Sequence, residues 1–202
     1  MTEFEKMIAG KIYDPNDSEI VALRQKAHRL NQEYNCLDET DPKREEILNQ
    51  LIPDRKNGVY LQGPIYFDYG INCSFGENSY ANFNFTVLDV CKVTIGDNVF
   101  MGPNVSIVPP IHPLRYQDRN IYKSSKGYYT DKGYAKPVTI KSNCWIASNV
   151  TICGGVTIGE GCVIGAGSVV TRSMPDNTLC AGNPCKVIRK ITEDDKIDES
   201  LL

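Results

Sequence analysis

The 202-residue sequence predicts a mainly β protein, a parallel β-helix with an N-terminal helical segment and a loop inserted between two of its coils. One observation behind this prediction is an aliphatic residue that recurs at every sixth position through the C-terminal half. A second is the Gly and Asn residues between these positions, which suit the corners of a repeating coil. A third is that most helical patterns lie outside the repeat, in residues 1–57.

Residues 1–57 contain two predicted helices. Asp17 or Ser18 can cap a helix that runs to about Tyr34. A second helix is predicted within residues 41–53, where an Asp-Pro pair can start it and a proline ends it. The apolar residues that share a face in these helices are Ile20, Leu23, Ala27, Leu30, Ile47, Leu48 and Leu51. We expect this segment and the tail after Met174 to cap the ends of the repeat.

The repeat itself consists of six consecutive hexads in the C-terminal half. Their aliphatic residues are Ile140, Ile146, Ile152, Ile158, Ile164 and Val170. An earlier run begins at Ile95, Met101 and Ile107, with fainter matches near Phe75 and Ala81. A six-residue aliphatic period fits neither an amphipathic helix nor a hairpin sheet, but it fits a parallel β-helix in which each hexad forms one flat face. Small residues at the fifth hexad position share the interior: Cys144, Val150, Val156, Cys162 and Ser168.

Bulk properties exclude several classes of protein. A net charge of −3 gives no sign of a nucleic-acid-binding surface. The N-terminus lacks the apolar region of a signal peptide, and no stretch is long and apolar enough to span a membrane, so we expect a cytoplasmic protein with no membrane partner. None of the eight cysteines forms a CxxC pair, so no zinc ribbon or thioredoxin-like site is indicated, and the thiols are expected to be reduced and mostly buried.

Several ordered motifs resemble the maltose and galactoside O-acetyltransferases of the hexapeptide-repeat group. They are EKMIAGKIYD, FDYG, ANFN, TIGDNVFMGPNV, IHPL, KPVTIKSNCWIAS, GVTIGEGCVIGAGSVVT and AGNPCKVIRKI, and they span nearly the whole chain. The resemblance implies a left-handed β-helix with three hexads per coil, a homotrimer, acetyl-CoA as the acetyl donor and no metal. With three hexads per coil, Cys144 and Cys162 should stack one coil apart, at about the 4.8 Å spacing of neighbouring strands.

The same resemblance suggests a division of the chain into three parts. Residues 1–57 would form a helical segment like that of maltose acetyltransferases. Residues 58–175 would form the catalytic β-helix, with the inserted loop at 113–136. Residues 176–202 would form a C-terminal cap and tail.

Of the two histidines, His112 is the candidate catalytic base. It ends the hexad run at IVPPIHP, where the chain leaves the repeat, and the family places its base in this His-Pro context. Acyl transfer to a hydroxyl needs a base that accepts the proton as the oxygen attacks the thioester, and histidine titrates near neutral pH. His28 lies in the predicted first helix and is expected to be a solvated or capping residue.

By similarity, the acceptor would contact Asp14, Asp68 and Asn82, and Asn82 would also contact the intermediate. Asp14 and Asp68 can equally be cap or turn residues, and Asn82 can be a corner residue. The acetyl-CoA site is expected at Trp145, Ser148, Ala166, Thr171, Arg172, Lys186 and Arg189, with the Ser148 N–H as oxyanion donor. Lys186 and Arg189 suit phosphates, although a solvated basic face is the alternative.

Three departures from the family concern the acceptor. Val90 follows Asp89 where one branch has two acidic residues, and Gly133 stands where an acidic residue is common. The inserted loop is about nine residues longer than usual and carries five tyrosines, which are good platforms for sugars or for a neighbouring subunit. A maltose, glucose or galactoside-like sugar is the leading acceptor. The alternatives are a hydroxylated xenobiotic such as an antibiotic, or a β-helix that binds without catalysis. A metal-dependent hydratase is disfavoured because only one histidine lies in the repeat.

Overall fold

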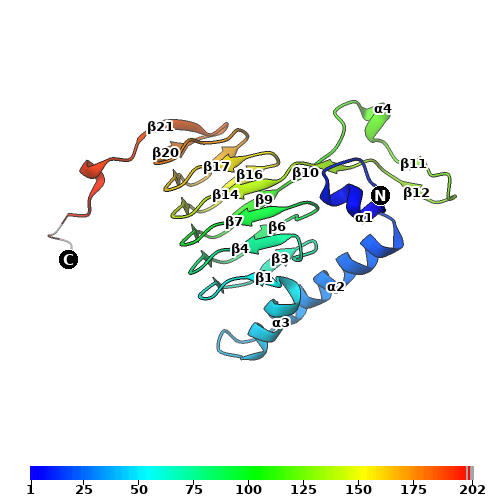
Figure 1. The fold of residues 1–202 in the computed structure, drawn as a ribbon, viewed down its shortest axis with the longest axis horizontal. Coiled ribbons are helices and arrows are strands. Elements are labelled where there is room, and N and C mark those ends of the chain that lie inside the picture. Colours follow the sequence, from blue (N-terminus) through cyan, green and yellow to red (C-terminus); the bar gives the residue numbers. More distant parts are fainter. Residues whose placement is uncertain (199, 201–202) are drawn as a thin grey trace.

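Each hexad forms a short strand followed by a turn in the computed structural model, which describes residues 1–198 and 200. The strands stack into a left-handed parallel β-helix of about six coils, and the N-terminal helical segment runs along one side of it to the end that holds the first coil (Figure 1). Three flat sheets make its faces, and we name them I, II and III in the order in which each coil visits them. Sheet I contains β1 (Asp54–Arg55), β4 (Cys73–Phe75), β7 (Val93–Ile95), β14 (Val138–Ile140) and β17 (Thr157–Ile158).

Sheets II and III complete the triangular coil. Sheet II contains β2 (Tyr60–Leu61), β5 (Tyr80–Ala81), β8 (Phe100–Met101), β15 (Trp145–Ile146), β18 (Val163–Ile164), β20 (Thr178–Ala181) and β21 (Lys186–Lys190). Sheet III contains β3 (Ile65–Phe67), β6 (Phe85–Val87), β9 (Ser106–Val108), β16 (Thr151–Cys153) and β19 (Val169–Val170). All of these strands pair in parallel except β21, which returns antiparallel to β20. Coil strands therefore extend past both ends of the 58–175 range expected from the sequence, because β1 precedes it and β20 follows it.

The hexad register agrees with the sequence analysis. In the C-terminal coils, Ile140 pairs with Ile158, which is the expected 18-residue step. Cys144 and Cys162 directly precede the paired residues Trp145 and Val163, and both thiols are buried. The prediction that the two cysteines stack one coil apart is therefore confirmed.

The N-terminal coils are longer, which explains why their sequence signal is faint. Phe75 pairs with Ile95, 20 residues further along, and Ala81 pairs with Met101 at the same interval. Two extra residues per coil at the corner after sheet III break the six-residue period without changing the stacking. Asparagines take the left-handed backbone conformation at the corners, with φ between 53° and 64°, at Asn78, Asn84, Asn98, Asn104, Asn143, Asn149 and Asn177.

The N-terminal segment forms α1 (Glu3–Ile8), α2 (Ser18–Asn35) and α3 (Lys43–Leu51). As predicted, Asp17 caps α2, since its side chain accepts from the Glu19 N–H. The short helix α1 was not expected, although Thr2 and Glu5 form a capping box at its start. Asn31 and Asn35, one turn apart on α2, bond to the backbone of β3. Helix α2 therefore covers the open edge of sheet III.

The inserted loop has secondary structure of its own. Strand β10 (Pro110–Ile111) leads into it, and the loop contains α4 (Tyr116–Arg119), β11 (Tyr122–Lys123), β12 (Tyr129–Thr130) and β13 (Tyr134–Ala135). β11 and β12 form a hairpin, and β13 pairs antiparallel with β10. The insertion, α1 and α2 all lie on the same side of the stack (Figure 1). Beyond β21 the tail contains a short 3-10 helix, Glu193–Asp195, and no described helix is long and apolar enough to cross a membrane.

Candidate active site

The corner between sheets III and I carries His112, directly after β10. Its Nδ1 lies 3.3 Å from the Lys132 carbonyl oxygen and 3.5 Å from an Asp131 carboxylate oxygen. Because both neighbours are acceptors, they favour the tautomer of the imidazole that carries its proton on Nδ1. Nε2 is then the basic nitrogen, on a side chain that is 55% exposed and accessible to a substrate. This corner, which we call the III–I corner, also receives the inserted loop.

Asp14 holds the inserted loop against the N-terminal segment. Its carboxylate accepts from the Tyr128 hydroxyl and from the Thr130 hydroxyl (2.8 Å), and its N–H donates to Glu3 (2.7 Å). Partial burial alone would raise the pKa of Asp14, but the hydrogen bonds from Tyr128 and Thr130 hold the pKa below its usual value. Both carboxylate oxygens therefore bond to the loop, and a sugar would have to join or replace these hydroxyls.

Asp68 lies directly after β3 at the same corner, 3.6 Å from Nε2 of His28 on α2. Burial raises the pKa of Asp68, and the neighbouring His28 opposes this shift. Tyr13 bonds to the inserted loop, since its N–H donates to the Gly133 carbonyl (3.4 Å). Burial, with nearby Tyr69 and the carboxylates of Asp68 and Asp131, raises the pKa of the Tyr13 phenol. The structure thus groups Asp14, Asp68 and His112 around one corner.

A second set of candidates stacks along the corner between sheets II and III, which we call the II–III corner. Asn82 precedes the turn between β5 and β6, while Ser148 and Ala166 each open the equivalent turn of a later coil. The Asn82 side chain accepts from the Phe83 N–H (2.7 Å), and its backbone is not left-handed, unlike that of Asn84.

The Ser148 N–H is open to a ligand from this corner. Within the described residues it donates no hydrogen bond. The adjacent coil has Gly102 beneath it, where a Cβ would lie 2.8 Å from the Ser148 nitrogen. Glycine therefore keeps the space around this donor open. Trp145 lies nearby on the outer face of sheet II, 54% exposed.

The basic candidates lie at the C-terminal end of the stack. Thr171, Arg172 and Lys186 line one cavity of about 490 Å³. Arg189 does not line it, because its guanidinium forms a two-pronged ion pair with Asp195, at 2.5 and 2.7 Å. That contact raises the pKa of Arg189 and lowers the pKa of Asp195 to about 2. Three of the four cationic or polar candidates are thus brought together.

Within one chain, six of the candidates fall into two groups on different corners, while Thr171 and Arg172 follow β19 at the C-terminal end of the III–I corner. His112, Asp14 and Asp68 lie at the III–I corner, whereas Asn82, Ser148 and Ala166 lie at the II–III corner. Residues missed by the sequence analysis include Asp131 beside His112 and the Tyr128 and Thr130 hydroxyls on Asp14; the only signal for them was the unusual length of the loop. Among the described residues, no three His, Cys, Asp or Glu side chains are grouped to hold a metal ion.

Comparisons with known proteins match both parts of this architecture. Residues 6–55 match the family model described as maltose acetyltransferase hexapeptide capping motif, and residues 137–172 match the bacterial transferase hexapeptide model of six repeats. The galactoside O-acetyltransferase of Escherichia coli K12 is 38% identical over 193 residues, covering 95% of this chain and 91% of the relative.

Solved structures of acetyltransferases show the same similarity over nearly the whole chain. The crystal structure of a maltose O-acetyltransferase from Clostridium difficile 630 is 45% identical, with a TM-score of 0.85 over 96% of this chain and 99% of that one. A galactoside acetyltransferase in complex with coenzyme A is 38% identical, with a TM-score of 0.89 over 98% of this chain and 96% of that one. The chain therefore belongs to the family of maltose and galactoside O-acetyltransferases, the acetyltransferases built on hexapeptide repeats.

Proposed function

We propose that the protein transfers the acetyl group of acetyl-CoA to a hydroxyl of a sugar such as maltose, glucose or a galactoside. Nε2 of His112 accepts the hydroxyl proton while the acceptor oxygen forms a bond to the thioester carbonyl carbon. The carbon–sulfur bond then breaks, and the imidazolium returns the proton to the departing thiolate. The products are the acetyl ester and free coenzyme A, with no covalent acyl-enzyme.

Two neighbouring groups support this chemistry. Asp131, 3.5 Å from Nδ1, orients the His112 ring and balances the charge of the imidazolium as it forms. The Ser148 N–H, which has no partner in the described chain, would donate to the oxyanion that develops on the thioester. Asn82, two coils away on the same corner, would contact the acceptor or the intermediate. The observation that carries the proposal is an exposed imidazole whose Nδ1 is engaged and whose Nε2 has no partner among the residues that the structure describes.

The division of the candidates between two corners favours a site shared by neighbouring subunits of a homotrimer. The III–I corner of one subunit would supply His112, Asp14 and Asp68, and the II–III corner of its neighbour would supply Asn82 and Ser148. Acetyl-CoA would run between them, with its phosphates near Thr171, Arg172 and Lys186, and with Trp145, Ala166 and Arg189 as further contacts. The coenzyme A complex of a 38% identical relative supports this donor.

The test is release of free thiol from acetyl-CoA with a panel of sugars and hydroxylated antibiotics, together with the mass of the assembly by light scattering. We expect activity on at least one sugar and the mass of a trimer. Activity on antibiotics alone would favour the xenobiotic acceptor. Binding of acetyl-CoA with no turnover on any acceptor would favour a non-catalytic binding protein, and a monomer would contradict the shared site.

A further inference from the structure

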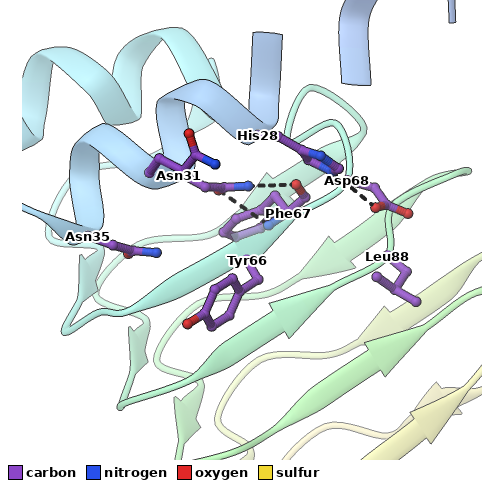
Figure 2. A pocket seen from close by; sticks show the side chains of 8 residues that line it. His28, Asn31, Asn35, Tyr66, Phe67, Asp68 and Leu88 are labelled. Carbon is purple, nitrogen blue, oxygen red and sulfur yellow. Dashed lines mark hydrogen bonds and ion pairs between the residues drawn. The ribbon is translucent and has the colours of Figure 1, made fainter. Parts of the chain in front are cut away.

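A cleft lies between helix α2 and the outer face of sheet III, and Asp68 is one of the residues that line it (Figure 2). Its volume is about 260 Å³. Figure 2 shows the His28 ring pointing to Asp68 across one end and Tyr66 and Leu88 on the sheet side. The volume lies just below the range of about 300–1,000 Å³ typical of pockets for drug-sized molecules, so the cleft suits a single small ring.

The walls of this cleft are held rigidly. Asn31 donates to the Phe67 carbonyl (2.8 Å), and Asn35 donates to the Ile65 carbonyl (2.9 Å). The N–H groups of Phe67 and Ile65 donate back to the same two side chains. These amides are therefore committed to the edge of sheet III, and they fix the separation of helix and sheet. The cleft is a preformed feature, which lowers the entropy that a ligand must lose on binding.

Other polar groups in the cleft are uncommitted. Tyr66 is 47% exposed, and neither its hydroxyl nor the Gln32 amide bonds to another group of the described chain. Asp68 is a hydrogen-bond acceptor that keeps a second oxygen beyond its contact with His28. A sugar ring has apolar C–H faces and a polar rim. The aromatic face of Tyr66 and the apolar Leu88 match the C–H faces, and the nearby hydroxyl, amide and carboxylate groups match the rim. The carboxylate disfavours phosphates and other anions.

The cleft is connected to the proposed acceptor site through Asp68. Asp68 lines the cleft and also lies at the III–I corner, where the Tyr13 N–H donates to the carbonyl of Gly133, two residues after the Asp131 that lies beside His112. Resting on the proposed function, we infer that this cleft binds a second, non-acetylated ring of an oligosaccharide or glycoside acceptor. The structure would thus favour acceptors of at least two rings over monosaccharides.

The experiment compares maltose with glucose as acceptors for the wild type and for Tyr66→Ala. Truncation of Tyr66 should lower the ratio of kcat/KM for maltose to that for glucose about tenfold, equivalent to about 1.4 kcal/mol. Gln32→Leu, at an exposed position of α2, should lower the same ratio by a smaller factor. Tyr60→Ala is the matched control, because Tyr60 is a similarly exposed tyrosine of the same coil on sheet II. A ratio that is equal in wild type and Tyr66→Ala would overturn the inference.

A binding measurement separates this inference from the proposed catalysis. Calorimetry with maltose and no acetyl-CoA requires no turnover. Weaker maltose binding by Tyr66→Ala than by Tyr60→Ala would support the cleft even if no sugar were acetylated. Undetectable maltose binding by the wild type, or equal binding by both variants, would refute it while leaving acetyl transfer to another acceptor possible.

Discussion

The two corners that border sheet III are built from the same hexads but differ in the length of their turns and in the side chains that they present. At the II–III corner, every coil turns in a few residues, and Asn84, Asn104 and Asn149 stack there with amide-to-amide hydrogen bonds of 2.9 Å. At the III–I corner, the N-terminal coils hold extra residues, and the inserted loop between β9 and β14 leaves the stack. The regular corner offers aligned backbone donors, and the irregular corner offers varied side chains.

This difference suggests how one fold accommodates a constant donor and variable acceptors. Under the proposed function, acetyl-CoA would be bound by a surface that repeats from coil to coil, because its long arm would pass several equivalent turns. The acceptor would be recognised where insertions bring side chains from distant segments together, as Asp14 and Thr130 are brought together here. Substitutions at the two corners test whether one binds the donor and the other the acceptor.

The largest effect is expected for His112→Ala. Loss of the general base should lower kcat/KM by about 10²–10⁴-fold, measured by thiol release, with an unchanged melting temperature because the side chain is exposed. Asn82→Ala should also reduce activity, from the other corner. A small effect of His112→Ala would assign the base to another group.

Trimers that combine His112→Ala and Asn82→Ala subunits test whether the two corners of one site come from different subunits. If each site takes His112 from one subunit and Asn82 from its neighbour, trimers reassembled from equal amounts of the two variants regain intact sites. Random assembly restores about one quarter of the sites, so activity should return to about a quarter of the wild-type value. No recovery in mixed trimers would show that both corners of one chain serve the same site.

The next largest effect, on the KM for acetyl-CoA, should differ between Lys186 and Arg189, which the sequence analysis assigned to the same phosphate site. Lys186 lines the C-terminal cavity, whereas Arg189 is held by Asp195. Lys186→Ala should raise the KM for acetyl-CoA about tenfold or more, because a hydrogen bond to a charged phosphate is worth about 1.5–3 kcal/mol. Arg189→Ala should raise it less, and the KM for the acceptor is the control in both variants. Equal effects would mean that the ion pair opens when acetyl-CoA binds.

A pair of glycine substitutions compares the packing of the two corners. Gly102→Ala at the II–III corner would place a Cβ 2.8 Å from the Ser148 nitrogen, a backbone atom that cannot move freely. We expect a loss of about 1–3 kcal/mol in stability and reduced activity. Gly133→Ala in the loop meets only the Tyr13 ring, at 3.9 Å or more, and should change stability by less than about 0.5 kcal/mol. Thermal melts of both variants check this, and an equal loss would show that the corners are packed alike.

The same contrast governs what the sequence could predict. The repeat, the inward aliphatic residues, the Cys144–Cys162 stack and the start of α2 follow from local period and capping, so each was predictable. The contacts of the inserted loop join residues more than a hundred positions apart, as in Tyr128 with Asp14, and no period marks them. The cleft at Asp68 depends in the same way on how α2 packs on sheet III. His28, expected to be a solvated or capping residue, is half-exposed and also lines the cleft for that reason.

The smallest expected effect concerns the docking of the loop on Asp14. The pKa of Asp14 in the folded protein lies below the unfolded value of about 3.9, so its ionised form contributes stability that is present above that pH. The contribution is lost as the pH falls through the lowered pKa, when the carboxylate takes up a proton. Asp14→Asn imitates the protonated form. Hydrogen exchange of residues 128–131 should be faster in this variant than in the wild type at pH about 7.

The pH dependence provides the control, because the chemical rate of exchange changes equally in both proteins at each pH. The difference between Asp14→Asn and the wild type should shrink as the pH falls well below about 4, where both side chains are uncharged. A difference that persists in acid would mean that an uncharged carboxyl still holds Tyr128 and Thr130 as well as the carboxylate does. Equal exchange at neutral pH would mean that the loop is held mainly by the strand pairing of β10 with β13. The acceptor side of the III–I corner would then be fixed by backbone contacts instead of by Asp14.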